Sequence, residues 1–107
     1  MNNLRGAYWE GVIQVRPKDK EVIAFIRNQV RKKKDACISK ELFFNYGVDI
    51  YITSQRLTRD IGRKLKNCFD GDLKITKKIY GKDRQKSKSL YRATVLFRLK
   101  PKEQQFL

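Results

Sequence analysis

The chain has no histidine, and only two of its 107 residues are cysteine and two are proline. Without histidine, acid–base catalysis at neutral pH lacks its usual side chain. Cys37 and Cys68 stand far apart, whereas a zinc site needs about four ligands and usually a close pair. A disulfide between them stays open as an alternative. We expect buried free thiols in a reducing compartment, because Cys68 falls on a helical apolar stripe.

Acidic residues are also scarce, since eleven Asp and Glu face 26 Lys and Arg. Asp70 and Asp72 flank Gly71 just after an expected helix, where such residues form turns far more often than they hold a metal. A metal-dependent nuclease usually needs several convergent carboxylates, and the other acids are scattered. Gly62 and Gly71 are isolated, so the sequence has no glycine-rich phosphate loop. We therefore expect no enzyme, no cofactor and no metal.

Long apolar runs are missing as well. No stretch reaches the roughly 20 apolar residues of a membrane span, and the N-terminus lacks a signal-peptide core. We expect no membrane partner and a cytoplasmic protein, or a nucleocytoplasmic one in a eukaryote. The net charge of +15 repels further copies of the chain, so we expect a monomer, and it attracts polyanions. Nucleic acid is the commonest such partner; an anionic membrane surface and simple solubility are the alternatives.

What the sequence does contain is a regular hydrophobic pattern, with 40% hydrophobic residues. Alternation predicts strands at 7–16, 37–44, 48–53, 73–80 and 90–99, and helical spacing predicts helices at 19–34 and 55–69. Pro17 ends the first strand, Asn45–Tyr46–Gly47 predicts a hairpin turn, and Ser54 can cap the second helix. Gly71 lies near the usual C-terminal cap position. This order predicts an α+β fold with two helices packed on one face of a mostly antiparallel sheet.

The same periodicity assigns side chains to faces. One face of the first strand is expected to hold Trp9, Gly11, Ile13 and Val15. One side of the second strand is expected to hold Ile38, Lys40, Leu42 and Phe44. The apolar stripe of the second helix is expected to hold Leu57, Ile61, Leu65 and Cys68. We expect residues 1–107 to form a single domain with its core at about 7–99.

The expected second helix carries a row of cations opposite its apolar stripe. Spacings of three, four and three align these cations: Arg56, Arg59, Arg63 and Lys66. Neighbours in such a row repel by roughly 0.2–0.5 kcal/mol each, and Asp60 relieves only one edge. A row of phosphates would stabilise the arrangement and would also release counterions. The row therefore predicts RNA binding, and the alternative is a plain solvated face.

The uncovered face of the sheet is expected to form a second basic patch. Its cations are Arg16, Lys74, Lys78, Arg92 and Arg98, and the tyrosines among them are Tyr8, Tyr51 and Tyr80. Basic residues interleaved with aromatic rings can hold phosphates and stack unpaired bases. Tyrosine is also a favoured strand residue without any ligand. The aromatic signature of an RRM and the GXXG motif of a KH domain are both missing.

Two shorter segments are also basic. Residues 81–88 are expected to form a polar loop with four cations: Lys82, Arg84, Lys86 and Lys88. Such a loop either becomes ordered on RNA or only keeps the tip soluble. The run RKKK at 31–34 ends the first helix, where cations either suit the negative end of the helix dipole or contact phosphates.

Three segments resemble a known family: WEGVIQVR (9–16), GVDIYITSQRLTRDIGRKL (47–65) and YRATVLFRL (91–99). From about Ala7 to Leu99 the chain resembles the central domain of the nonsense-mediated decay protein 3 family. The members are large-ribosomal-subunit export adaptors of eukaryotes and their archaeal relatives. The WE-x-VIQVR stretch is the most specific part of the resemblance.

The resemblance implies a non-catalytic module that binds ribosomal RNA of the large subunit and acts in subunit assembly, maturation or export. It also implies a fold related to eukaryotic ribosomal protein L twenty-two. Family members carry an N-terminal domain with paired CxxC zinc motifs and usually a further β-rich domain, so we expect a fragment of a longer protein. The Lys-rich, compact form resembles the archaeal members. The alternative is a protein-interaction module that contacts ribosomal proteins or a ribosome-associated factor.

Overall fold

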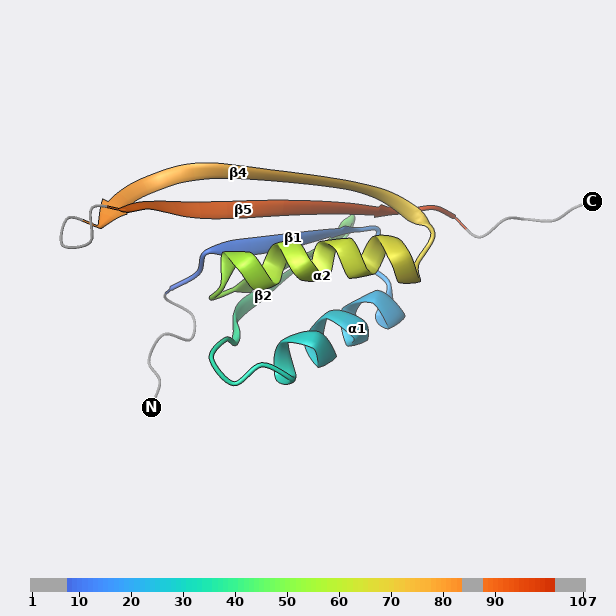
Figure 1. Cartoon of the computed structure of the whole chain (residues 1–107). Coiled ribbons are helices and arrows are strands. Elements are labelled where there is room, and N and C mark those ends of the chain that lie inside the picture. Colours follow the sequence, from blue (N-terminus) through green and yellow to red (C-terminus); the bar gives the residue numbers. More distant parts are fainter. Residues whose placement is uncertain (1–7, 84–87, 102–107) are drawn as a thin grey trace, which may run out of the picture.

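Five strands and two helices make up the fold in the computed structural model (Figure 1). The structure describes residues 8–83 and 88–101. For residues 80–83 and 88–89 it describes the backbone alone. The elements are β1 (Gly11–Arg16), α1 (Lys20–Arg31), β2 (Ile38–Phe44), β3 (Gly47–Ile52), α2 (Gln55–Cys68), β4 (Gly71–Asp83) and β5 (Lys88–Leu99). The expected order of strand, helix, hairpin, helix and hairpin is confirmed.

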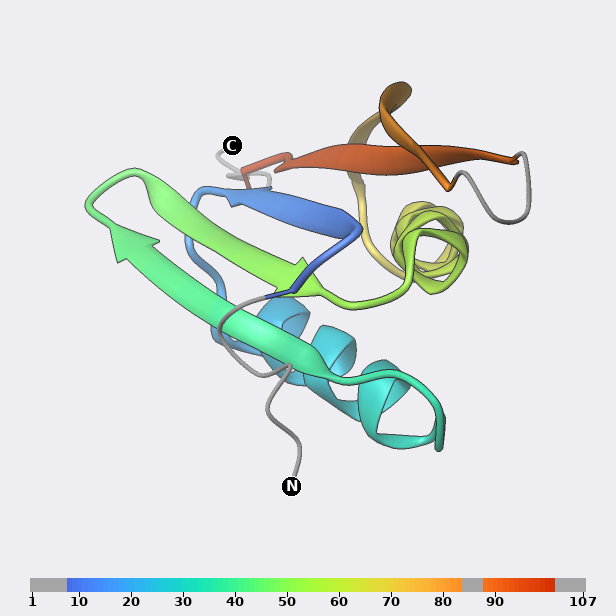
Figure 2. The same cartoon turned by 90° about the vertical axis from the view of Figure 1, so that its left-hand side faces the viewer.

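The strands form one sheet in the order β2-β3-β1-β5-β4 (Figure 2). Three of the four neighbouring pairs are antiparallel, and in the fourth β1 and β5 run parallel. The first strand of the domain therefore lies beside the last. Both helices pack on the same face of the sheet, which confirms the expected α+β arrangement and leaves the other face uncovered by helices (Figures 1 and 2).

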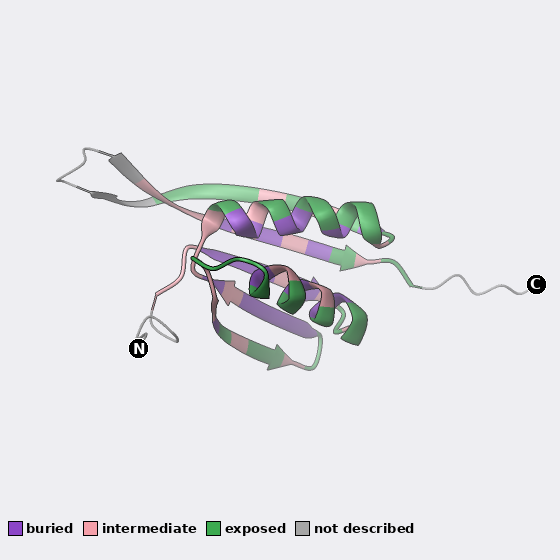
Figure 3. Ribbon diagram, turned by 60° about the horizontal axis from the view of Figure 1, so that its bottom comes forward, coloured by how far each residue is buried: buried purple, intermediate pink, exposed green. Residues whose placement is uncertain are grey.

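The core lies between the sheet and the two helices. Each contributing strand presents every second side chain to the helices, because successive side chains of a strand point to opposite faces. The fully buried members on the strands are Ile13, Val15, Val48, Ile50, Ile52, Val95 and Phe97. Helix α2 adds Leu57, Ile61 and Leu65, so its apolar stripe faces the sheet while its outer side stays exposed (Figure 3).

Both helices begin at the residue types that cap helices. Asp19 Oδ1 accepts the backbone N–H groups of Glu21 and Val22 at 2.9 and 3.0 Å, and so starts α1. Ser54 Oγ accepts the N–H of Leu57 at 3.1 Å and starts α2, as expected. These bonds satisfy N–H groups that have no partner within a helix. The cap at Ser54 fixes the point, just after β3, at which α2 begins. Helix α2 carries the predicted row of cations.

Helix α2 also lies unusually close to the sheet at Gly11. A Cβ atom built on Gly11 would stand 2.1 Å from Thr58 Oγ1 and 2.5 Å from Thr58 Cβ. At Gly62, a Cβ would meet Val95 Cγ1 at 2.9 Å. Glycine at these two positions therefore sets how closely α2 packs on β1 and β5.

Three predicted side-chain directions are wrong. The indole of Trp9 does not follow Ile13 and Val15 toward the helices. It lies among side chains of the open face, because the chain bends at Glu10 before β1 begins. In β2, the pairing shifts between Ile38 and Lys40. This irregularity leaves Ile38 on the side opposite to Lys40, Leu42 and Phe44.

The third wrong direction is that of Cys68, which is exposed. Helix α2 ends at this residue, and the extended Phe69 takes its place against the core, with its ring 5.6 Å from that of Phe25. Cys37 is half-buried, and both thiols are free. The expectation of buried thiols is therefore wrong, and the alternative of a disulfide is also excluded.

Three predicted boundaries differ from the structure as well. Helix α1 ends at Arg31 and not at residue 34. Gly71 does not cap α2 but opens β4, where a Cβ would stand 2.6 Å from the carbonyl oxygen of Arg98. The expected loop at 81–88 is shorter, because β4 continues to Asp83 and β5 begins at Lys88. The paired part of the β4–β5 hairpin is therefore longer than the polar sequence predicted.

Candidate nucleic-acid interface

The predicted basic row lies on the outer side of α2. Arg56, Arg63 and Lys66 are exposed, and Arg59 is half-buried. Leu57, Ile61 and Leu65 anchor the opposite side of the helix in the core. Because the four cations follow one another over ten residues, they extend along about 15 Å of helix. The structure therefore brings the predicted residues together on one surface, here called the α2 row.

The contacts of the α2 row leave most of its charge uncompensated. Arg59 Nε donates to Gln55 Oε1 at 2.9 Å, and Lys66 Nζ donates to the carbonyl oxygen of Gly71 at 3.0 Å. Arg63 forms an ion pair with Asp60 at 3.1 Å, with both side chains more than half exposed. Such surface pairs stabilise by about 0–1 kcal/mol. The pair therefore opens easily when a stronger anion approaches.

A second basic segment lies beside the beginning of the α2 row. The run at 31–34 is exposed, and Lys33 and Arg56 line one shallow hollow of about 160 Å³ between the end of α1 and the start of α2. Asp35 and Asp60 line the same hollow. Lys64, on the α1 side of α2, donates to Gln29 Oε1 at 3.1 Å. Sequence reasoning missed this juxtaposition because it depends on how α1 and α2 pack.

The open face of the sheet carries the second predicted patch. The cross-strand register places Lys78 opposite Arg92, Lys74 opposite Leu96 and Arg98 opposite Asp72. Lys74, Lys78 and Arg98 are exposed, whereas Arg92 and Tyr51 are half-buried. Tyr8 is half-buried too, and its hydroxyl donates to the carboxylate of Glu10. The predicted cations therefore do lie on the open face, but the carboxylate of Asp72 offsets part of their positive charge at one end.

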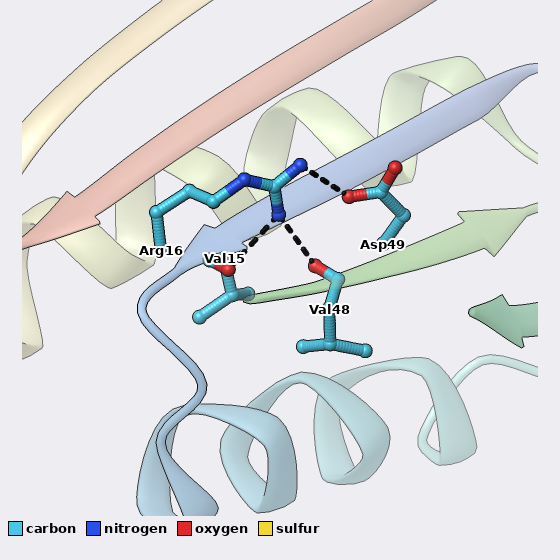
Figure 4. A network of polar contacts seen from close by, with 4 residues as sticks. All are labelled: Val15, Arg16, Val48 and Asp49. Atoms are coloured by element: carbon cyan, nitrogen blue, oxygen red, sulfur yellow. Dashed lines mark hydrogen bonds and ion pairs between the residues drawn. The ribbon is translucent and has the colours of Figure 1, made fainter. Parts of the chain in front are cut away.

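Arg16 belongs to the fold and not to this patch (Figure 4). Its guanidinium donates to the carbonyl oxygens of Val15 and Val48 at 3.0 and 3.2 Å, and to Asp49 Oδ1 at 2.8 Å. The side chains of Arg16 and Asp49 are only 20% and 11% exposed. The pair ties β1 to β3, so little of this charge is available to a ligand.

The open face also holds a cluster of rings and cations, in which Tyr51 and Arg92 were predicted from the sequence and Trp9 and Lys40 were missed. The rings of Trp9 and Tyr51 meet edge to face, with their centroids 4.9 Å apart. Arg92 stacks over Trp9 at 3.9 Å, and Lys40 lies over Tyr51 at 4.7 Å. The four residues Lys40, Tyr51, Trp9 and Arg92 are here called the aromatic cluster. Burial, and then the charge of Asp49, raises the pKa of the Tyr51 hydroxyl.

Most of the cations predicted for the β4–β5 connection lie outside the described part of the structure. Arg84 and Lys86 lie outside the described residues, as do the side chains of Tyr80, Lys82 and Lys88. Closer to the sheet, Lys77 lies over the Tyr91 ring at 4.6 Å, and Ile79 is 62% exposed. The β4–β5 hairpin extends past the N-terminal end of α2 (Figure 1).

Acidic residues gather at the far end of α2. A hollow of about 650 Å³ lies between the C-terminal end of α2, the start of α1 and the end of β5. Its floor includes Phe69 and Leu99, and its rim includes Asp19, Glu21 and Asp70. Asp70 is 3.9 Å from Lys100. These carboxylates disfavour phosphate binding at the hollow itself.

Two further features bear on the kind of site. Within residues 8–83 and 88–101, no group of three or more histidine, cysteine, aspartate or glutamate residues could hold a metal ion. None of the helices in the described part of the chain is long and apolar enough to cross a membrane.

Comparison with known proteins identifies the family. No curated protein matches the chain. The family model described as NMD3, second domain, matches residues 8–99. This range contains both helices, all five strands, the α2 row and the aromatic cluster. It also agrees with the resemblance found in the sequence. The chain therefore belongs to the NMD3 family, carries its second domain, and has a ribosome-related function.

Proposed function

We propose that this domain is a non-catalytic module that binds ribosomal RNA of the large subunit in assembly, maturation or export. The observation that carries the proposal is the α2 row, four cations aligned on the outer side of a helix with Asp60 as their one acidic ion-pair partner among the described residues. Within the isolated domain, neighbouring cations of the row repel one another. Phosphates placed along it would remove that repulsion and release counterions.

The charge distribution over the whole domain supports the same assignment. The chain carries a net charge of +15, whereas the acidic hollow gathers carboxylates at the C-terminal end of α2. An RNA strand along the α2 row would start near Lys33 and Arg56 and run toward Lys66. Membership in a ribosome-related family supports ribosomal RNA as the polyanion.

The test measures binding of this chain to structured fragments of large-subunit ribosomal RNA as a function of salt. Four phosphate contacts would weaken binding about a hundredfold between about 50 and 200 mM salt. Arg59→Gln with Arg63→Gln should lower the slope of log K against log salt by about 1.4–1.8. This should hold for all RNA sequences alike, because phosphate contacts carry no sequence information.

The matched control neutralises two exposed lysines elsewhere, Lys18→Gln with Lys20→Gln, next to the acidic hollow. Both double variants have the same net charge. The proposal requires a clearly larger loss for the α2 pair. Equal losses would mean that net charge alone attracts the RNA, and binding that does not depend on salt would exclude the proposal.

A second candidate function rests on the acidic hollow. Its apolar floor and three-carboxylate rim fit a Lys- or Arg-bearing segment of a ribosomal protein or a ribosome-associated factor. Under this alternative, the basic surface only accelerates encounter with the ribosome. Capture of ribosomal proteins from nuclease-treated extract separates the two candidates. An RNA-mediated contact disappears there, whereas a direct protein contact persists and is lost in Glu21→Lys.

A further inference from the structure

The aromatic cluster is the feature of the open face that neither the fold nor the α2 row explains. Its members come from three strands and the segment before β1, and they form one continuous line across the sheet. Lys40 lies over Tyr51, Tyr51 meets Trp9 edge to face, and Arg92 stacks on Trp9. Arg92 Nε also donates to the carbonyl oxygen of Trp9 at 3.2 Å.

The cluster stays accessible to a ligand. Trp9, Tyr51 and Arg92 are half-buried, and Lys40 is exposed. Both helices of the described chain pack on the opposite face of the sheet, so neither lies over the open face (Figure 2). Indole and phenol rings are large apolar surfaces with a polar edge, which makes them common anchors at binding interfaces.

The charges around the rings select the ligand. Cations flank the aromatic pair at both ends, and the register extends the line with Lys78 opposite Arg92. The nearby carboxylate of Glu10 is already engaged, since it accepts the backbone N–H of Gln55 and the hydroxyl of Tyr8. A ligand with flat, apolar rings joined by negative charges matches this arrangement, and a nucleic-acid strand is such a ligand.

The pairing state of that strand follows from geometry. In a duplex the bases are stacked on one another and their faces are inaccessible to a protein ring. Unpaired bases can turn outward and stack on aromatic side chains or on the plane of a guanidinium. The outer surface of Arg92, which already lies on Trp9, adds such a plane to the two rings.

We propose that the aromatic cluster stacks an unpaired base of an RNA strand, whose neighbouring phosphates lie over Lys40 at one end and over Lys78 and Arg92 at the other. This inference rests on the proposed RNA binding and deepens it. The α2 row and the aromatic cluster lie on opposite sides of the sheet. The first holds phosphates of any strand, and the second requires an unpaired segment.

Trp9 provides a direct probe, because it is the single tryptophan of the chain. The experiment titrates the whole chain at low salt with three polyanions: a single-stranded oligoadenylate, a blunt RNA duplex and inorganic polyphosphate. Binding of each is measured by competition against a labelled RNA, and the fluorescence of Trp9 is recorded in parallel. Stacking of a base on the cluster should quench Trp9 with the single strand, whereas the duplex and polyphosphate should bind without comparable quenching.

Substitutions test the same contact by affinity. Tyr51→Ala and Trp9→Ala should each weaken single-strand binding about tenfold to a hundredfold, with little change for the duplex. Tyr51→Phe and Trp9→Phe retain a ring and should bind nearly as the unaltered chain does. The matched control is Phe43→Ala, which removes a 53% exposed ring of β2 outside the cluster.

The outcomes distinguish this inference from the proposed function. Single-strand binding without quenching, or equal quenching by polyphosphate, overturns the stacking contact. A Phe43→Ala loss as large as that of Tyr51→Ala also overturns it. In each of these cases, salt-dependent duplex binding through the α2 row still stands. Failure of every RNA to bind at low salt overturns both proposals together.

Discussion

Replacing Gly11 by alanine should strongly destabilise the domain, because it places an atom where α2 already lies. The new Cβ would stand 2.1, 2.5 and 2.8 Å from Oγ1, Cβ and Cγ2 of Thr58. Rotation of the threonine side chain cannot move its own Cβ, so α2 must shift away from β1. Overpacking of a core typically costs 1–3 kcal/mol, and we expect a loss of about 3 kcal/mol for an overlap that a new rotamer cannot relieve.

The assay is urea unfolding followed by Trp9 fluorescence and by circular dichroism, analysed by linear extrapolation. Thr58→Gly removes all three overlapping atoms, together with the hydrogen bond from Thr58 Oγ1 to the carbonyl oxygen of Ser54 at 2.7 Å. Alone it should cost about 1–2 kcal/mol. In the double variant, Gly11→Ala should add almost nothing, which corresponds to a coupling energy of about 3 kcal/mol.

Gly62→Ala is the matched control on the same helix. Its Cβ would meet Val95 Cγ1 at 2.9 Å, a much smaller overlap, and alanine gains about 1 kcal/mol of helix propensity over glycine. We expect a change of less than about 1 kcal/mol. A Gly11→Ala variant as stable as the unaltered chain, or strictly additive losses at Gly11 and Thr58, would refute this packing of α2 on β1.

Two further predictions concern polar groups of the sheet. Arg16→Ala removes two carbonyl contacts and leaves the Asp49 side chain, which is 11% exposed, without its cation. Urea unfolding should show a loss of about 2 kcal/mol, whereas Arg31→Ala on the exposed end of α1 should change stability by less than about 0.5 kcal/mol. Burial raises the pKa of Tyr51 in the folded state, so its contribution to stability is present below the unfolded value of about 10 and is lost as the pH rises through the folded value. The fall in unfolding free energy between about pH 8 and 11 should therefore be smaller in Tyr51→Phe, and an equal fall in both proteins would contradict the shift.

The fold was predictable wherever local chemistry and burial agreed. Val48, Ile50 and Ile52 alternate with polar residues and are all fully buried, because β3 lies between two strands and has one face against the helices. Asn45 and Tyr46 form the expected turn, and Ser54 caps α2. These features depend on a few neighbouring residues, so the sequence pattern contains them.

Features that depend on distant parts of the chain were not predictable. The shift between Ile38 and Lys40 reverses a face that strict alternation assigns, and only the pairing with β3 reveals it. The bend at Glu10 turns Trp9 to the open face, where it meets Tyr51 and Arg92. The α2 row followed from helical spacing alone. The aromatic cluster did not, because four separate segments contribute to it.

The parallel pairing of β1 with β5 determines when the domain becomes complete during its synthesis. Val12 pairs with Thr94. Strand β1 is synthesised first, but it cannot complete its pairing until β5 has been synthesised. Until β5 emerges, β1, β2 and β3 form a partial sheet in which one edge of β1 lacks its partner, and such edges readily pair with other chains. Contacts this distant in sequence also form slowly. We therefore expect a chain that stops between α2 and β5 to be aggregation-prone.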